Sequence, residues 1–124
     1  MGCGIGRGMM PEVRRGEIWL VNFDPTIGHE IQKQRPAIIV QNDLGNKYSP
    51  ITIVAPITSQ GTDKIYPIEI LLTDENSGLI KKSKALFNQI RAVDKRRLIK
   101  KIGKITEETT DNMNEAIKIS LGLW

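Results

Sequence analysis

Short runs of β-branched and aromatic residues, each ended by a turn cluster, constrain the fold of this chain more than any other feature. Val, Ile, Thr and aromatic residues favour extended backbone, whereas Gly, Pro, Asn and Asp interrupt it. The runs span residues 17–23, 37–40, 51–58, 66–72, 83–93 and 99–105. Five to seven short strands with such regular turn spacing predict a small β-barrel.

Two of these runs carry positional information. Residues 37–40 are apolar on both faces, which predicts a buried strand in the middle of the sheet. Residues 51–58 alternate instead, so that two sets of side chains face opposite sides. One set is Ile51, Ile53, Ala55 and Ile57, and the other is Thr52, Val54, Pro56 and Thr58. Because proline has no backbone N–H, Pro56 predicts that this strand lies at a sheet edge or is bulged there.

The chain ends in a helical pattern. Thr106 is a typical N-cap residue, and acidic residues follow it where the helix dipole favours them. Apolar and small residues then recur at helical spacing, at Met113, Ala116, Ile117, Ser120, Leu121 and Trp124. This helix is expected to pack one stripe on the barrel or on a partner. The predicted class is therefore mainly β, or α+β, with one C-terminal helix.

The segments between the runs read as turns. Clusters of Asn, Asp, Gly, Ser and Pro occupy residues 42–46, 48–50 and 74–78. Residues 94–98 predict a short helical turn, and Asp94 is its expected N-cap.

Length and composition indicate one globular domain without a metal site. A chain of 124 residues supports one hydrophobic core, which we assign to residues 11–124, after a flexible Gly-rich tail at residues 1–10. The single cysteine and single histidine, Cys3 and His29, are too few for a His/Cys zinc site. We therefore expect no cofactor and catalysis that is independent of metal or uses only a loosely held hard cation. No apolar run approaches about 18 residues, which predicts no membrane span. A lone cysteine fits a reducing cytoplasm.

Positive charge is concentrated in one stretch of the sequence. The net charge is +4 and the pI is about 9.3. Ten cations lie between residues 81 and 104, with Asp94 as the only acid among them: Lys81, Lys82, Lys84, Arg91, Lys95, Arg96, Arg97, Lys100, Lys101 and Lys104. Either a solvated face or a surface for RNA or another acidic partner explains such a stretch.

A polar loop that ends at Arg35 holds most of the residues suited to chemistry. It contains His29, the only histidine, beside Glu30. A residue that precedes proline is held in extended geometry, so Pro36 fixes the backbone of Arg35 at the start of the apolar run.

Motifs along most of the chain resemble the MazF/PemK (Kid) family of toxin endoribonucleases. The similarity covers residues 14–121, and its motifs fall at residues 15–21, 24–30, 35–36, 41–46, 49–50, 56–58 and 89–94. The resemblance implies an SH3-like barrel, a homodimer and metal-independent cleavage of single-stranded RNA. It also implies an antitoxin whose tail blocks the RNA groove.

The resemblance assigns roles to individual residues. In metal-free cleavage the ribose 2′-OH attacks its own phosphate, so the transition state needs a fixed cation and groups that carry protons. Arg35 matches the catalytic arginine of the MazF branch, and Thr58 matches the threonine that helps to hold the phosphate. His29 is a possible helper, and Glu30 is a possible base or a group that orients Arg35.

Two departures from the family pattern concern RNA contacts. The PemK branch uses an Arg and an Asp at the positions of Leu86 and Asn88, so its catalytic trio is not carried over whole. Asn88 and Gln89 are expected to read bases, because an amide does not titrate. Lys33 adds a charge where family loops have glycine, and it is expected to contact RNA.

Two other functions remain open at the level of sequence. The CcdB toxins share this barrel and bind gyrase without being nucleases, and fold alone does not fix function. A non-catalytic barrel that binds RNA or a peptide is the third possibility. The pair Arg35 and Thr58 favours the nuclease, because a gyrase binder has no need for it.

Overall fold

The computed structural model describes residues 11–23 and 34–123 and has the predicted class, mainly β with a C-terminal helix. The strands are β1 (Glu17–Asn22), β2 (Gln34–Ile39), β3 (Ile51–Thr58), β4 (Glu69–Leu72), β5 (Ser83–Leu86), β6 (Arg91–Asp94) and β7 (Leu98–Lys104). The α-helices are α1 (Asp43–Tyr48), α2 (Asp74–Ser77) and α3 (Glu107–Leu121), and the 3-10 helices are η1 (Phe87–Gln89) and η2 (Lys95–Arg97).

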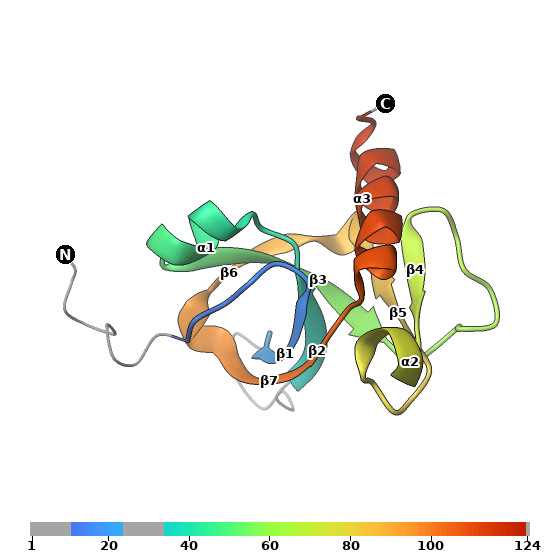
Figure 1. Ribbon diagram of the computed structural model, residues 1–124, viewed down its shortest axis with the longest axis horizontal. Coiled ribbons are helices and arrows are strands. Elements are labelled where there is room, and N and C mark those ends of the chain that lie inside the picture. The colour runs from blue at the N-terminus through green and yellow to red at the C-terminus, as the bar shows by residue number, and fades with distance from the viewer. Residues whose placement is uncertain (1–10, 24–33, 124) are drawn as a thin grey trace, which may run out of the picture.

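The seven strands form one antiparallel sheet in the order β4-β5-β3-β2-β1-β7, and β6 pairs with β3. Figure 1 shows β1, β2, β3, β6 and β7 curled around one half of the molecule, with α3 beside β4 and β5 in the other half. Strands β6 and β7 are joined by η2, and no ladder connects them in the described part of the chain. The predicted barrel is therefore curled but open.

Two hydrophobic clusters lie on opposite sides of the sheet. The first includes Ile18, Ile38 and Phe87 and is covered by Met113 and Ala116 of α3. The second lies inside the curl and consists of Val13, Trp19, Val21, Ala37, Ile39, Val54, Val93 and Leu98. Because side chains alternate along a strand, β1 and β2 supply both clusters in turn. This explains why residues 37–40 are apolar without alternation, as predicted for a buried strand.

The structure corrects two expectations about β3. The strand is central, not at an edge, because β2 lies on one side and β5 and β6 lie on the other. On that second side β6 pairs with Ile51–Val54 and β5 with Ile57–Thr58. Pro56 falls between these ladders, where a residue without an N–H is tolerated. The buried face also changes there, since Thr52 and Val54 are buried before it and Ala55 and Ile57 around it.

Three other segments differ from the expectation. The run 83–93 is not one strand but is divided by η1, where Phe87 turns into the core and its carbonyl accepts a hydrogen bond from Ser120 Oγ at 2.8 Å. Residues 42–50 contain α1 rather than only turns, because the Asn42 side chain caps the Gly45 N–H. In the third segment, residues 66–78, the strand begins only at Glu69 and Asp74–Ser77 form α2 where only a turn was expected.

Several local predictions are confirmed. Thr106 is the N-cap of α3 and accepts a hydrogen bond from the Thr109 N–H. Asp94 caps η2 through the Arg96 N–H. Within α3, Met113 and Ala116 are buried, whereas Leu121 is half exposed, so the apolar stripe contacts the core only over its first part. None of the helices in the described residues has the length and apolarity needed to cross a membrane.

Glu17 is a buried carboxylate at the start of β1. Its Oε1 accepts hydrogen bonds from the Arg14 N–H and from Trp19 Nε1, both at 3.0 Å, and Lys101 Nζ lies 3.1 Å from Oε2. Burial alone would raise the pKa of Glu17, but these hydrogen bonds and the Lys101 charge together lower it. The ionised carboxylate thus stabilises the fold.

We predict that Glu17→Gln destabilises the protein at neutral pH and that the difference from wild type shrinks in acid. The folded-state pKa lies below the ordinary glutamate value of about 4.3, so the stabilisation is complete above that value and is lost as the pH falls through the folded-state pKa. Denaturant unfolding at a series of pH values measures the difference. Glu12→Gln, at an exposed acid, is the control, and a pH-independent difference for Glu17→Gln would contradict the assignment.

Candidate functional site

The sheet register brings Arg35 and Thr58 together. In the β2–β3 ladder the last pair toward this end of the sheet is Ala37 with Pro56. Arg35 lies two residues before Ala37 and Thr58 lies two residues after Pro56, so they occupy facing positions just beyond the ladder. Residues that face each other across antiparallel strands point to the same side of the sheet. The register therefore puts the two residues predicted to act together at the ends of adjacent strands, on one side of the sheet.

Arg35 is held by the strand and presents its side chain to solvent. It is paired with Val21 of β1 and is exposed. In the described part of the chain no hydrogen bond or ion pair engages its guanidinium. By strand alternation its side chain lies on the same face as Val21 and Ala37, opposite the cluster that α3 covers. The geometry thus provides a cation on a rigid backbone whose five N–H donors are available to a bound anion.

Thr58 ends β3 and keeps a hydroxyl donor for a ligand. Its Oγ1 accepts a hydrogen bond from the Gln60 N–H at 3.0 Å. A hydroxyl has one proton to donate and two lone pairs, so this contact fixes the oxygen without using the proton. The Thr58 hydroxyl can therefore donate to an anionic oxygen beside Arg35.

A buried ion pair fixes the position of the segment that follows Thr58. Lys84 of β5 is the ladder partner of Thr58, and its Nζ lies 2.9 Å from Glu69 Oε1. Both side chains are only 10% exposed. The same Nζ donates to the Lys64 carbonyl at 3.2 Å, and Gly61 approaches it in a left-handed conformation, with φ of 63°. Lys84 thus anchors residues 59–68 and is not available as a phosphate ligand.

The other predicted site residues fall into two groups. His29, Glu30 and Lys33 lie outside the described residues. Asn88 and Gln89 lie in η1 and are exposed. Because η1 connects the two strands that pair with β3 on the side away from β2, these amides lie across β3 from Arg35. No group of three His, Cys, Asp or Glu side chains that could hold a metal ion occurs among the described residues.

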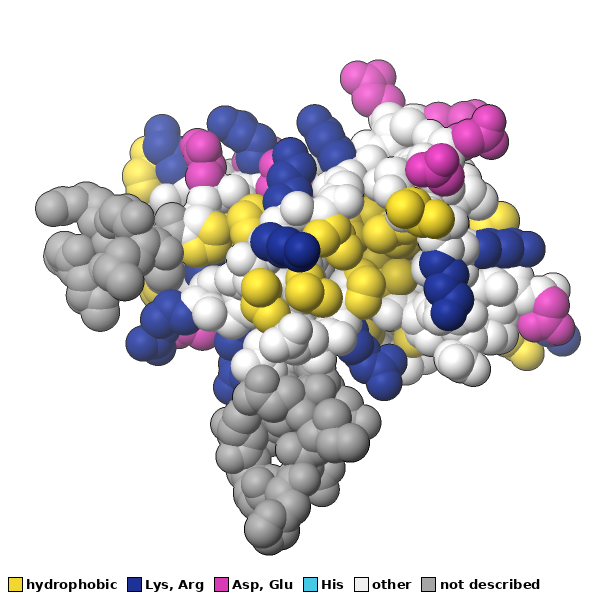
Figure 2. Space-filling view, turned by 90° about the horizontal axis from the view of Figure 1, so that it is seen from below, with side chains coloured by type: hydrophobic (Ala, Val, Ile, Leu, Met, Phe, Trp, Pro, Cys, Tyr) yellow, Lys and Arg dark blue, Asp and Glu magenta, His cyan; other side chains and the backbone are white. Residues whose placement is uncertain are grey.

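The ten cations between residues 81 and 104 do not form one patch. Five have polar partners of their own: Lys84 pairs with Glu69, Arg96 with Asp94 and Lys101 with Glu17, while the buried Lys95 donates to the Asn46 carbonyl and Arg97 donates to the Asn22 carbonyl. Figure 2 shows Lys and Arg side chains scattered over one face, with apolar side chains gathered at its centre. Structural contacts and exposure to solvent thus account for much of the positive charge between residues 81 and 104.

One cation near the site was missed as an individual candidate. Arg91 is the first residue of β6, and its Cζ lies 5.2 Å from the centre of the Phe23 ring. The sequence placed Arg91 within the basic stretch and within the family motif at residues 89–94 without giving it a role, and Phe23 was read only as part of a strand. Nothing in the sequence pattern connects these two distant residues.

Comparison with known proteins identifies the family. Residues 14–121 match the family described as PemK-like, MazF-like toxin of type II toxin-antitoxin system. The chain belongs to this family. Endoribonuclease EndoA of Bacillus subtilis is 38% identical to this MazF-like chain over 111 residues, which cover 90% of this chain and 96% of that protein.

Solved structures share the fold of this MazF-like chain. An endoribonuclease from Mycobacterial species aligns with a TM-score of 0.77 at 19% identity and covers 94% of this chain and 98% of that one. An endoribonuclease in complex with its cognate antitoxin, also from Mycobacterial species, aligns with a TM-score of 0.75 at 20% identity, covering 90% and 97%. At these identities the likeness establishes the common fold.

We predict that Glu69→Gln destabilises the protein by roughly 3–5 kcal/mol, because it leaves the buried Lys84 ammonium without its counter-charge. The exposed pair of Glu115 with Lys118 is the matched control, and Glu115→Gln should change the free energy of unfolding by less than about 1 kcal/mol. Denaturant unfolding of both variants measures the contrast. Equal effects would show that the Glu69 pair does not anchor this region.

Proposed function

We propose that this protein is the toxin of a type II toxin–antitoxin pair and cleaves single-stranded RNA, in particular mRNA, at specific sequences without a metal ion. The observation that carries the proposal is the strand register, which puts Arg35 and Thr58 at facing positions just beyond the β2–β3 ladder. Membership of the MazF-like family and the endoribonuclease name of the Bacillus subtilis relative support it.

The chemistry follows from what the two side chains can do to a phosphodiester. The planar guanidinium of Arg35 binds two phosphate oxygens at once, and the Thr58 hydroxyl donates to one of them. The ribose 2′-OH then attacks phosphorus, the bond from phosphorus to O5′ breaks, and the products carry a 2′,3′-cyclic phosphate and a 5′-OH. Fixed donors stabilise the charge that builds up on the phosphate oxygens in the transition state.

Proton transfer and base recognition need other groups. The 2′-OH must lose a proton and O5′ must gain one. We assign His29 as a helper in these transfers and Glu30 as a base or as the group that orients Arg35. Asn88, Gln89 and Lys33 are proposed to contact RNA. The exposure of Asn88 and Gln89 on η1 is consistent with amides that read base edges.

The proposed setting has two protein partners. A cognate antitoxin is expected because the family is defined by such systems and because a structural relative was solved with its antitoxin. A homodimer is expected from the family resemblance. We place the protein in the cytoplasm, where mRNA is available. A gyrase-binding toxin of the CcdB type is the alternative, and it would not require the Arg35 and Thr58 pair.

Arg35→Ala should reduce RNA cleavage by at least about a hundredfold, the scale seen when one charge-stabilising donor is removed from an active site. The assay uses a mixed-sequence single-stranded RNA in EDTA, with wild type as reference. Arg96→Ala removes the same charge at an exposed arginine that pairs with Asp94 and should cleave normally.

The same assay separates the alternatives. Replacing the ribose at a mapped cleavage step by 2′-deoxyribose should abolish cutting there. Equal cutting of the deoxy step would rule out attack by the 2′-OH. Intact RNA after incubation with wild type would instead favour the gyrase-binding or non-catalytic reading.

Thr58→Ala should lower kcat more than it weakens RNA binding, because the hydroxyl is proposed to act on the phosphate rather than on the bases. Thr58→Ser keeps the hydroxyl and should restore most of the lost turnover. Single-turnover cleavage and binding to an uncleavable 2′-O-methyl RNA measure the two effects separately. A parallel loss of binding and turnover, or no rescue by serine, would make Thr58 a folding or binding residue.

A further inference from the structure

Arg91 and Phe23 form a paired aromatic and cationic surface that the proposed chemistry does not use. The Arg91 Cζ lies 5.2 Å from the Phe23 ring centre, within the range of a cation–π contact. Phe23 is half buried and packs against the hydrophobic cluster inside the curl, so the position of its ring is fixed by that cluster. Arg91 is exposed. The guanidinium thus lies against the ring while remaining accessible to a ligand.

This pair adjoins the Arg35 and Thr58 site. Val21 of β1 faces Arg35 in the β1–β2 ladder, and Phe23 follows Val21 by two residues, which places its side chain on the same side of the sheet. Arg91 faces Val54 of β3. Val54 lies on the same strand as Thr58 and precedes it by two pleat repeats. Phe23 therefore contacts Arg91 and lies on the same side of the sheet as Arg35.

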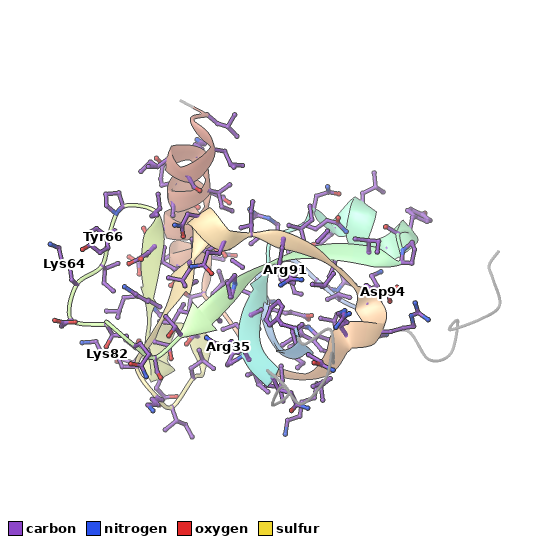
Figure 3. All side chains as sticks on the ribbon, turned by 180° about the vertical axis from the view of Figure 1, so that it is seen from behind. Arg35, Lys64, Tyr66, Lys82, Arg91 and Asp94 are labelled. Atoms are coloured by element: carbon purple, nitrogen blue, oxygen red, sulfur yellow. The ribbon has the colours of Figure 1, made fainter. Side chains whose placement is uncertain are left out.

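The contacts of Arg91 differ from those of its neighbour Arg96. Arg96 donates to both carboxylate oxygens of Asp94, at 3.0 Å each. Within residues 11–23 and 34–123, no hydrogen bond or ion pair engages the Arg91 guanidinium. Figure 3 shows Arg91 and Asp94 at opposite ends of β6. Phe23 therefore contacts the Arg91 guanidinium, whose N–H groups have no hydrogen-bond partner among these residues.

We propose that Phe23 and Arg91 form a stacking platform for one nucleobase of the RNA, next to the phosphate held by Arg35. The inference rests on the proposed function. Single-stranded nucleic acid is commonly bound by stacking bases on aromatic rings and on arginine planes, with cations along the backbone. The base stacks on the accessible face of the guanidinium, and the N–H edges contact a neighbouring phosphate. A lysine at this position would supply the charge but no planar surface.

The test measures binding of a mixed-sequence 2′-O-methyl RNA, which cannot be cut because its 2′-OH is blocked. Arg91→Ala should weaken binding about tenfold, as loss of a stacking residue does. Arg91→Lys should recover little of that affinity, although its salt dependence should match wild type because the positive charge remains. Phe23→Leu keeps an apolar side chain without the ring and should weaken binding severalfold. Arg96→Ala is the charge-matched control and should bind within about twofold of wild type.

Thermal unfolding of each variant is measured alongside the binding assay, so that a variant that fails to fold is recognised. Arg91→Lys is the mildest change, and its affinity decides whether Arg91 acts as a planar platform or as a point charge. Wild-type affinity for Arg91→Lys would show a point-charge contact and overturn the platform. Equal weakening by Arg96→Ala and Arg91→Ala would overturn it as well. Cleavage of ordinary RNA by wild type is measured in parallel. Loss of binding in the Arg91 and Phe23 variants together with no wild-type cleavage would support the platform while refuting the proposed nuclease.

Discussion

The change of partners along β3 is the constraint on which the rest of the molecule depends. This strand pairs with β2 on one side throughout the ladder, whereas on the other side it passes from β6 to β5 at Pro56. The first half of β3 therefore belongs to the curl and the second half to the layer under α3. Because the two halves share one continuous strand, the site at its end is positioned by both hydrophobic clusters at once.

That arrangement separates the rigid and the variable parts of the site. Arg35 and Thr58 lie on strands, and strands position chemical groups more reproducibly than loops do. The segment after Thr58 is anchored by the buried pair of Lys84 and Glu69. A buried ion pair is costly to desolvate, and its use here is consistent with a positional role rather than a stabilising one. Substrate preference can then vary through loops and surface side chains while the phosphate position stays fixed.

Much of the local structure could be predicted from sequence because its causes are local. Thr106 and Asp94 cap their helices through hydrogen bonds to residues two or three positions away. The strand at residues 17–23 was recognised by its β-branched and aromatic composition. The prediction was wrong where tertiary contacts decide. The run 83–93 contains a turn because Phe87 must enter the core, and Pro56 is tolerated centrally because the neighbouring strand changes there.

The site was predictable only in part for the same reason. Residue spacing alone does not predict that Arg35 and Thr58 occupy facing positions. The family resemblance suggested the pair, and the register of β2 and β3 gives the structural reason. Arg91 could not be distinguished from the other cations of its stretch, because their different partners are known only from the structure.

The central claim is that a fixed cation and a hydroxyl promote attack by the ribose on its own phosphate. The most direct measurement is the chemistry of the ends left on RNA after incubation with the protein. The account predicts a 2′,3′-cyclic phosphate, detectable by mass spectrometry, on the upstream fragment, and a 5′-OH that a polynucleotide kinase labels without prior dephosphorylation on the downstream fragment. A 5′-phosphate with a 3′-OH would contradict it, because those ends require water rather than the 2′-OH as the nucleophile.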